Sequence, residues 1–229
     1  MTADIFNALS ALLPAYLLGA IPFGLLIAKA KGVDLLSCGS KNIGATNVAR
    51  CVGPGWGVLA FAADMLKGFG GVWCAAIPLS WGAPVESQLL LLKMLCGVSA
   101  MLGHIFPVYL RFKGGKGVST ALGLLLGVAP MAGLLGLCAW IPIFLVGRYV
   151  SVASCLAAVV VGASVWTPLY GDRPLWFSVV FTALAALTIL KHRQNVVRLI
   201  RGTENRFAFT EAQRQARDAK RRAQGEERA

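Results

Sequence analysis

The stretch ALGLLLGVAPMAGLLGLCAWIPIFLV, Ala121–Val146, decides how many times this chain crosses a membrane. A spanning helix needs about 20 apolar residues, so the stretch is too long for one upright helix and marginal for two. It contains Pro130 and Pro142, with Gly133 and Gly136 between them. We predict two short helices that break near Gly133 to Gly136. The alternative is a re-entrant hairpin that dips into the membrane and returns.

The composition of the chain is that of an integral membrane protein. Of its 229 residues, 57% are hydrophobic and only 14% are charged, which is too apolar for a soluble domain of this length. Besides the opening stretch, five windows are apolar enough to cross a membrane, although the last is short. They are Ile5 to Ala28, Gly55 to Leu79, Gln88 to Leu110, Ser151 to Leu169 and Leu175 to Leu190. The first window lacks the basic n-region of a signal peptide, so we expect it to be a retained helix.

Lys and Arg residues gather in three polar loops that follow apolar windows. The first loop is Gly39 to Arg50, the second is Gly103 to Thr120 and the third is Lys191 to Asn205. By the positive-inside rule, all three loops belong in the cytoplasm. The turn from Ser80 to Glu86 has no Lys or Arg, which suits the outside.

This sidedness requires an even number of crossings between the second loop and the third. The windows 151–169 and 175–190 supply two, so Ala121–Val146 must cross twice or dip and return. We therefore predict an all-α integral membrane protein with seven transmembrane helices, two of them short and within 121–146. The N-terminus is expected outside and the C-terminus in the cytoplasm. The re-entrant alternative has five true spans and the same sidedness.

The last residues differ in composition from the rest of the chain. We expect residues 1–207 to form a single multi-span membrane domain and residues 208–229 a charged, flexible cytoplasmic tail. Charges of both signs alternate along this tail without an apolar stripe, which is typical of a solvated helix or a disordered segment. No interleaved aromatic residues or reading motif accompany the basic residues, so a nucleic-acid partner is not expected.

The second loop contains the sequence KGGKG, which runs from Lys113 to Gly117 just before an apolar helix. Unhindered backbone N–H groups, a helix N-terminus and two lysines together favour binding of a phosphate. The sequence is not a Walker loop, because Gly117 stands where that motif requires Ser or Thr. The alternative to a phosphate site is a flexible turn at the membrane surface, whose lysine side chains extend into the aqueous phase.

The chain has two histidines, and each lies in a basic loop. A histidine titrates near neutral pH and can act as a base. His192 is the better candidate, because a helix would place Asn195 and Arg198 on roughly the same face. For His104 we favour a structural hydrogen bond.

Asp64 and Lys67 lie inside the second apolar window at a spacing of three residues. Ionisable groups inside a bilayer are costly and usually pair, so we expect these two to pair with each other. Of the ten acidic residues, only Asp64 lies in an apolar window, which leaves too few carboxylates for a metal centre. We therefore expect no metal.

The six cysteines show no CxxC or CxxH spacing and lie mostly in apolar segments. We interpret them as small packing residues, with neither a disulfide framework nor a zinc site. They are Cys38, Cys51, Cys74, Cys96, Cys138 and Cys155.

Four segments, in this order, resemble one family: the bacterial membrane acyl-phosphate:glycerol-3-phosphate acyltransferases of the PlsY type. The resemblance covers Ile5 to about Phe207. The segments are GSKNIGATNVAR (Gly39 to Arg50), DMLKG (Asp64 to Gly68), GHIFPVYLRFKGGKGVST (Gly103 to Thr120) and HRQNVVRLIRGTEN (His192 to Asn205). Each segment alone is a weak signal, but four in order on this hydropathy pattern are specific.

The resemblance implies that an acyl group passes from acyl phosphate to the 1-hydroxyl of glycerol 3-phosphate, which yields lysophosphatidate and phosphate. It implies a bacterial inner-membrane enzyme whose site faces the cytoplasm, without cofactor, metal or acyl-CoA. The partners implied are both substrates, membrane lipids and the enzyme that produces the acyl phosphate, through functional coupling.

The resemblance also implies roles for individual residues. It implies a catalytic group of Ser40, Arg50, His192 and Asn195 and a phosphate-binding group of Lys113, Gly114, Gly115, Lys116 and Gly117. We further expect Asn42, Thr46 and Asn47 to bind substrate, and Asp64, Lys67, His104 and Glu204 to support the site. An acyl phosphate has a good leaving group, so the chemistry mainly requires that two phosphates meet, that an oxyanion is stabilised and that one proton is removed. Ser40 or Asn42 could donate a hydrogen bond to the oxyanion, and we expect Ser40 to act as such a donor rather than to form an acyl-enzyme. The proton acceptor is either His192 or the phosphate of the substrate.

A transporter or binding protein for a phosphorylated small molecule is the leading alternative function. Basic loops would bind the same anions there, and glycines would break helices along a substrate path. We find no internal repeat, however, and the polar groups cluster at one membrane interface rather than at its middle.

Overall fold

The structure, a computed structural model, describes residues 2–79 and 86–208 of the chain. Within these ranges the protein is all helical. The α-helices are α1 (Thr2–Ala20), α2 (Phe23–Ala30), α3 (Ala45–Cys51), α4 (Pro54–Trp73), α5 (Ala76–Leu79), α6 (Glu86–Ile105), α7 (Val118–Val128), α8 (Pro130–Gly147), α9 (Val150–Ser164), α10 (Leu175–Lys191) and α11 (Arg193–Ile200), with short 3-10 turns η1 (Val108–Leu110) and η2 (Pro168–Tyr170). The predicted tail, apart from Ala208, and most of the predicted outer turn lie outside the described residues.

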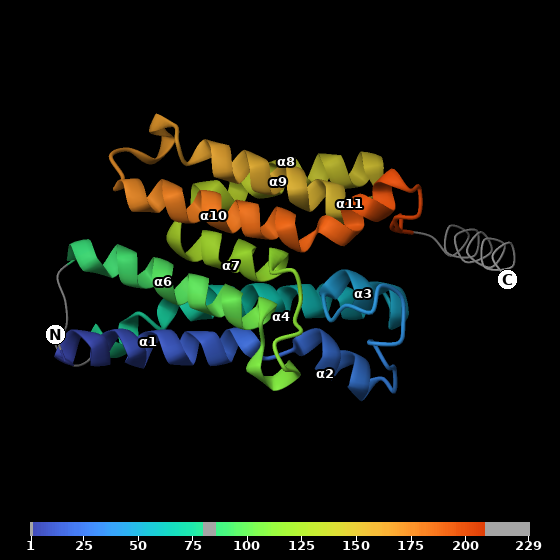
Figure 1. The fold of residues 1–229 in the computed structure, drawn as a ribbon, viewed down its shortest axis with the longest axis horizontal. Coiled ribbons are helices and arrows are strands. Elements are labelled where there is room, and N and C mark those ends of the chain that lie inside the picture. Colours follow the sequence, from blue (N-terminus) through green and yellow to red (C-terminus); the bar gives the residue numbers. More distant parts are fainter. Residues whose placement is uncertain (1, 80–85, 209–229) are drawn as a thin grey trace, which may run out of the picture.

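The long helices lie side by side along a common axis (Figure 1). Helices α1, α4 and α6 pack against one another, and α8, α9 and α10 form a second group. Helix α7 connects the groups, since it packs on α4 and α6 as well as on α8. The start of α1 lies at one end of the bundle, whereas α3 and α11 lie at the other (Figure 1).

Glycines bring the backbones of crossing helices into direct contact. A Cβ atom at Gly123 of α7 would overlap the carbonyl oxygen of Met65 in α4, and one at Gly68 of α4 would overlap that of Thr120. Gly19 of α1 lies in the same way against α6. Small residues at helix crossings are typical of membrane proteins, where close packing replaces the hydrophobic effect as the force between helices.

The expected single helix over Ile5 to Ala28 is broken between α1 and α2. Pro22 has no N–H to continue the helix and restricts the residue before it, which explains the break at this point. At the break, the carbonyl oxygen of Ile21 accepts a hydrogen bond from the backbone N–H of Phe23 at 3.1 Å and another from the Nζ of Lys67 at 2.7 Å. The two helices together, Ala8–Ala30, are still apolar and long enough to span a membrane.

The predicted break near Gly133 to Gly136 is wrong. Helix α7 ends at Val128 and α8 begins at Pro130, so the chain turns at Ala129. The reason is again proline, which has no N–H to donate and whose ring disfavours the helical conformation of the preceding residue. Both glycines continue inside α8.

Length and composition identify three helical segments of the described chain as candidate spans, or four if the bent pair of α10 and α11 is counted as one. Helix α7 has 11 residues, and at about 1.5 Å per residue it reaches roughly half of the ~30 Å hydrocarbon thickness. The helices carry large apolar side chains on their outer faces. On α1, for example, Leu9 and Leu13 are each more than half exposed, as expected for a surface that faces lipid.

The close contact between α4 and α7 predicts that a methyl group added at Gly123 lowers the stability of the protein. We expect Gly123→Ala to lower the unfolding free energy by about 1–3 kcal/mol, because the added Cβ must push the two backbones apart. Thermal unfolding of the purified protein in detergent measures this loss. Gly55→Ala at the start of α4 is the control, since nothing lies within 4 Å of its added Cβ. Equal stability of both variants would contradict the proposed close packing.

Candidate active site

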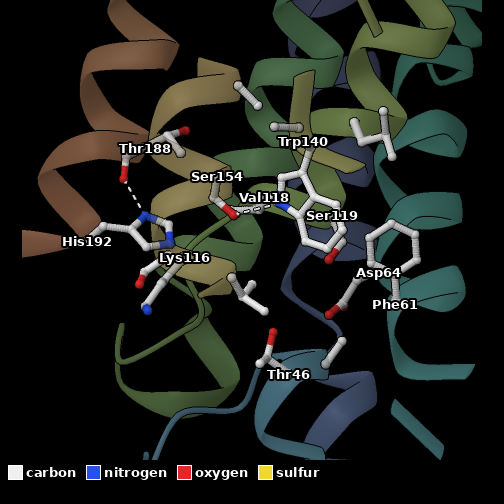
Figure 2. A pocket seen from close by; sticks show the side chains of 18 of the residues that line it. Thr46, Phe61, Asp64, Lys116, Val118, Ser119, Trp140, Ser154, Thr188 and His192 are labelled. Carbon is white, nitrogen blue, oxygen red and sulfur yellow. Dashed lines mark hydrogen bonds between the residues drawn. The ribbon is translucent and has the colours of Figure 1, made fainter. Parts of the chain in front are cut away.

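A cavity of about 640 Å³ lies between the two groups of helices. Its mouth is polar and is formed by the first loop, the end of the second loop, and α11 with the residues that follow it. Its deeper part runs between α7, α8, α9 and α10. Figure 2 shows Lys116, Thr188 and His192 on one side of this cavity, and Phe61 and Asp64 across it. Residues far apart in the sequence therefore meet in one place.

Asn47 holds the first loop in its folded shape. The buried side chain accepts a hydrogen bond from the backbone N–H of Ser40 at 2.8 Å. Its Nδ2 lies 3.2, 3.1 and 2.9 Å from the carbonyl oxygens of Leu35, Cys38 and Asn42, and its two hydrogens are shared among these three acceptors. This one amide therefore fixes the backbone on which Ser40 stands.

Two cysteines close the same loop, which corrects the interpretation of all six as packing residues. Cys38 and Cys51 form a disulfide over a sequence separation of 13 residues. The sequence spacing gave no signal, because the two meet only when the loop curls around Asn47. The other four cysteines are free, in agreement with the prediction.

Only the last part of the KGGKG sequence in the second loop reaches the cavity. Lys116 and Gly117 line the cavity, whereas Lys113, Gly114 and Gly115 lie outside its lining. A Cβ at Gly115 would overlap the His104 ring, and the Gly115 N–H donates to the His104 carbonyl oxygen at 3.0 Å. The first two glycines of KGGKG thus pack the loop against the end of α6. Their predicted role in phosphate binding stays a prediction.

A hydrogen-bond network joins the second and third loops at the cavity mouth. The Nζ of Lys116 donates to Oδ1 of Asn195 at 2.5 Å, and Nδ2 of Asn195 donates to Oε1 of Glu204 at 2.6 Å. Glu204 also accepts from the Ser151 hydroxyl at 2.8 Å and from Nε of Arg198 at 2.8 Å. The carboxylate of Glu204 therefore orients two side chains of α11 and one of α9.

Charge and burial set the ionisation of this network. Burial, followed by the nearby Arg198 and Arg50, outweighs the attraction of Glu204 and lowers the pKa of Lys116 to about 8. Burial alone would raise the pKa of Glu204, but hydrogen bonds from Asn195, Ser151 and Arg198 prevail and lower it. Near neutral pH the mouth thus holds three cationic side chains and one carboxylate, an excess of positive charge suited to an anion.

His192 lies in the turn between α10 and α11, which meet at an angle of 49°. Its Nδ1 is 2.8 Å from the carbonyl oxygen of Thr188 (Figure 2). A carbonyl oxygen only accepts, so the proton sits on Nδ1 and the other ring nitrogen, Nε2, is an acceptor in the neutral ring. Burial and the charge of Lys116 lower the pKa of His192 to about 4, which keeps the ring neutral near pH 7.

The expected pair of Asp64 and Lys67 is confirmed. Their side chains lie 2.8 Å apart, and both are almost fully buried. The Nδ1 of His104 lies 3.5 Å from the same oxygen of Asp64, and His104 is 4% exposed. Asp64 and His104 line the cavity, and Asp64 lies across it from His192 (Figure 2), so this buried group forms one of its walls.

The structure brings most of the residues predicted for the site to the cavity. Its lining includes Ser40, Asn42, Thr46, Asn47, Arg50, Asp64, His104, Lys116, Gly117, His192, Asn195 and Glu204. Lys67 touches the site only through Asp64. The role of each residue in binding or catalysis stays a prediction. Within residues 2–79 and 86–208, no three His, Cys, Asp or Glu side chains are grouped as a metal site would require.

Sequence reasoning missed two polar groups on α9. Ser151 binds Glu204, and Ser154 accepts a hydrogen bond from Nε1 of Trp140 at 3.1 Å. Both serines line the cavity. Their spacing of three residues in an otherwise apolar window is a signal that could have revealed them, since it places two hydroxyls on one helix face.

The deeper part of the cavity is an apolar channel, which we define by its lining from Leu122 on α7, Gly136 on α8, Ala158 on α9 and Leu184 on α10. It also opens to the side between α4 and α8. Val58 and Phe61 of α4 and Ile141 of α8 line the cavity and yet are 68%, 37% and 47% exposed. An apolar group can therefore enter from the side that faces lipid.

Comparisons with known proteins agree on one family. The family model described as "Glycerol-3-phosphate acyltransferase" matches residues 9–202. A glycerol-3-phosphate acyltransferase of Aquifex aeolicus is 44% identical over 201 residues, which cover 88% of this chain and 100% of that protein. The enzyme of the same name from Geotalea daltonii is 43% identical and covers 84% of this chain and 94% of its own length.

Two crystal structures of PlsY, an integral membrane glycerol 3-phosphate acyltransferase, are similar in fold. The glycerol 3-phosphate form has a TM-score of 0.76 and 42% identity, and covers 88% of this chain and 96% of that one. The lysophosphatidic acid form has a TM-score of 0.74 and 41% identity, and covers 88% and 95%.

The lowered pKa of Lys116 predicts how anion binding depends on pH. Below pH 8 its ammonium group is charged, and above pH 8 it loses its proton, so affinity for inorganic phosphate should fall as pH rises from 7 to 9.5. Loss of one charged hydrogen bond, about 1.5–3 kcal/mol, weakens binding roughly tenfold or more. Titration calorimetry measures the affinity. Lys116→Arg is the control, because arginine stays charged and should remove the decline; a decline that persists in this variant would exclude Lys116 as its source.

The hydrogen bonds of Asn47 predict that a substitution that keeps the shape of this side chain still lowers the stability of the fold. Asn47→Asp keeps the acceptor for Ser40 but removes the two N–H donors that three carbonyl oxygens share, and it places a carboxylate beside those oxygens. We expect a loss of about 1–3 kcal/mol for each buried carbonyl left without a donor. Thermal unfolding with the disulfide intact provides the measurement. Asn42→Asp keeps the one bond its side chain accepts, from Gly44, and should unfold near the wild-type temperature.

Proposed function

Because the chain belongs to the glycerol-3-phosphate acyltransferase family, we propose that it transfers a fatty acyl group from an acyl phosphate to the 1-hydroxyl of glycerol 3-phosphate. The products are 1-acylglycerol 3-phosphate and inorganic phosphate. One observation carries the proposal: a single cavity joins a cationic mouth to an apolar channel. A substrate with a phosphate at one end and an alkyl chain at the other fits such a cavity.

The cationic mouth would hold the two phosphates close together. Arg50, Lys116 and Arg198 are its cations, and all three line the cavity. Two dianions repel each other in water, so a site that offsets this repulsion supplies much of the catalysis by bringing the reactants together. Asn195 and Glu204 would keep Lys116 and Arg198 in place through the network described above.

Transfer requires one bond to form and one to break at the acyl carbon. The hydroxyl oxygen of glycerol 3-phosphate attacks the carbonyl carbon, the negative charge moves to the carbonyl oxygen, and the bond to phosphate then breaks. Ser40 would donate a hydrogen bond to that oxyanion, which is the role of an oxyanion-hole donor. No metal or cofactor enters these steps, and phosphate itself is the leaving group.

The proton of the attacking hydroxyl needs an acceptor. His192 holds its own proton on Nδ1, so its Nε2 would accept a hydrogen bond from the hydroxyl and orient it. With a pKa of about 4, however, this ring is a weak base. A phosphate monoester has a second pKa of about 6, so we propose that the phosphate of the substrate takes the proton.

The membrane arrangement remains part of the proposal. We propose seven spans in a bacterial inner membrane, formed by residues 1–207 as one domain, with the N-terminus outside and the mouth of the cavity facing the cytoplasm. The start of α1 and the mouth at opposite ends of the bundle support this sidedness (Figure 1). The Cys38–Cys51 disulfide argues for the opposite side, because thiols are generally kept reduced in the cytoplasm.

The remaining partners follow from the same reaction. We propose that the enzyme takes its acyl phosphate from membrane lipid through the side opening, and that it works in functional coupling with the enzyme that makes this donor. The transporter alternative gains no support, because core side chains close the channel at its inner end.

A direct assay tests the reaction. Purified protein given palmitoyl phosphate and glycerol 3-phosphate should release orthophosphate and form lysophosphatidate in the presence of a chelator. We expect Ser40→Ala to lower kcat about 10²-fold, which is the cost of losing one oxyanion donor, and Arg50→Ala to raise KM. Lys41→Ala is the control, because this lysine is exposed and lies outside the cavity lining. Activity that requires a divalent metal, or acyl-CoA as donor, would overturn the proposal.

A further inference from the structure

The apolar channel ends at Phe181, whose side chain is 2% exposed and lines its inner end. We propose that Phe181, together with Val161, sets the longest acyl chain that this protein accepts. This inference rests on the proposed function, since it names the residues that select among acyl donors. The position of these residues along their helices supports it.

The lining residues of α10 measure the depth of the channel. Phe181, Ala185 and Thr188 occupy one face of the helix, and His192 follows at the mouth. Phe181 lies 11 residues before His192, which corresponds to about 16 Å at a rise of about 1.5 Å per residue. On α9, Ser151 at the mouth and Val161 are 10 residues apart, which corresponds to a similar depth of about 15 Å. Two helices therefore place the end of the channel at the same level.

This depth matches the length of one lipid chain. The hydrocarbon core of a bilayer is about 30 Å thick, so each leaflet, and each chain within it, occupies about 15 Å. A chain whose head group lies near His192 would extend down the channel and meet Phe181 with its terminal carbons. A longer chain would have to displace Phe181, fold back or leave through the side opening between α4 and α8, and each of these removes its terminal carbons from the channel.

The inner end is packed too tightly to give way. The ring of Phe181 packs edge to face on Phe177, with centroids 4.8 Å apart. Phe177, itself 1% exposed, belongs with Phe181, Val161 and Leu124 to one core cluster. Insertion of further methylene groups into such packing is costly, so this end forms a fixed stop.

The walls above the stop leave room for a chain because their side chains are small. Ala185 on α10, Ala158 on α9 and Gly136 on α8 line the channel. The hydroxyls in its upper part are bonded within the protein: Thr188 donates to the Leu184 carbonyl oxygen, and Ser154 accepts from Trp140. An alkyl chain can therefore pass them without leaving a buried polar atom unpaired.

A pair of neighbouring alanines provides the test. Ala185→Leu fills the channel above its stop, whereas Ala186 is exposed on the outer face of α10, so Ala186→Leu is the matched control. We expect Ala185→Leu to lower kcat/KM for the longest saturated acyl phosphates about tenfold or more relative to the shortest, because one methylene too many in a closed pocket has an effect of this size. Ala186→Leu should keep the wild-type profile.

The opposite change at the stop is Phe181→Leu, which shortens the side chain and should allow donors longer than the wild-type limit. A thermal unfolding curve shows that the variant is folded. If the chain-length profile is the same in wild type, Ala185→Leu and Phe181→Leu, the inference is wrong.

Binding measurements separate this inference from the proposed reaction. Saturated alkyl phosphates of increasing length cannot transfer an acyl group, so their affinities report on the channel alone. A maximum length that shifts in Ala185→Leu and Phe181→Leu supports the inference even if no donor is turned over, in which case only the proposed function fails. Turnover with an affinity that rises with length equally in all variants would overturn the inference and leave the function intact.

Discussion

The site depends on one carboxylate. Glu204 accepts hydrogen bonds from Asn195, Ser151 and Arg198, and through Asn195 it also orients Lys116. A nearly buried carboxylate is costly unless hydrogen bonds satisfy it. The segment after α11 is therefore held against α9 and the start of α7. This contact joins the second and third loops into one cavity mouth.

The membrane explains how charge is distributed around that mouth. Polar groups are costly in hydrocarbon, so they concentrate at one end of the bundle, while the deeper channel carries only small and apolar side chains or hydroxyls bonded within the protein. The buried group of Asp64, Lys67 and His104 is the exception. Lys67 offsets the charge of Asp64 and also donates a hydrogen bond to the Ile21 carbonyl oxygen at the break before Pro22. The buried ion pair of Asp64 and Lys67 thus contacts the break between α1 and α2 and also forms a wall of the cavity.

Sequence reasoning succeeded where the signal was local. The pairing of Asp64 with Lys67 followed from their spacing, and the end of α10 near His192 followed from the hydropathy. It failed at Ala129, because it placed the break at glycines and not before Pro130, whose missing N–H and ring end α7 there. Composition alone does not mark this proline, since Pro142 lies inside α8. It also missed the disulfide of Cys38 and Cys51, since a curled loop, and not the spacing, brings the two together.

The sequence by itself determined the class of protein, the family and the three loops that carry polar side chains, because composition and short motifs are properties of the chain alone. Only the tertiary structure decided which of those side chains share a cavity. It placed Lys116 in the mouth and Lys113 outside it, although three residues separate them. It also placed Phe181, an ordinary apolar residue in the sequence, at the end of the channel. The physical reason is that such roles depend on how four helices pack around one cavity. No local sequence pattern encodes which residues of different helices come to lie next to one another.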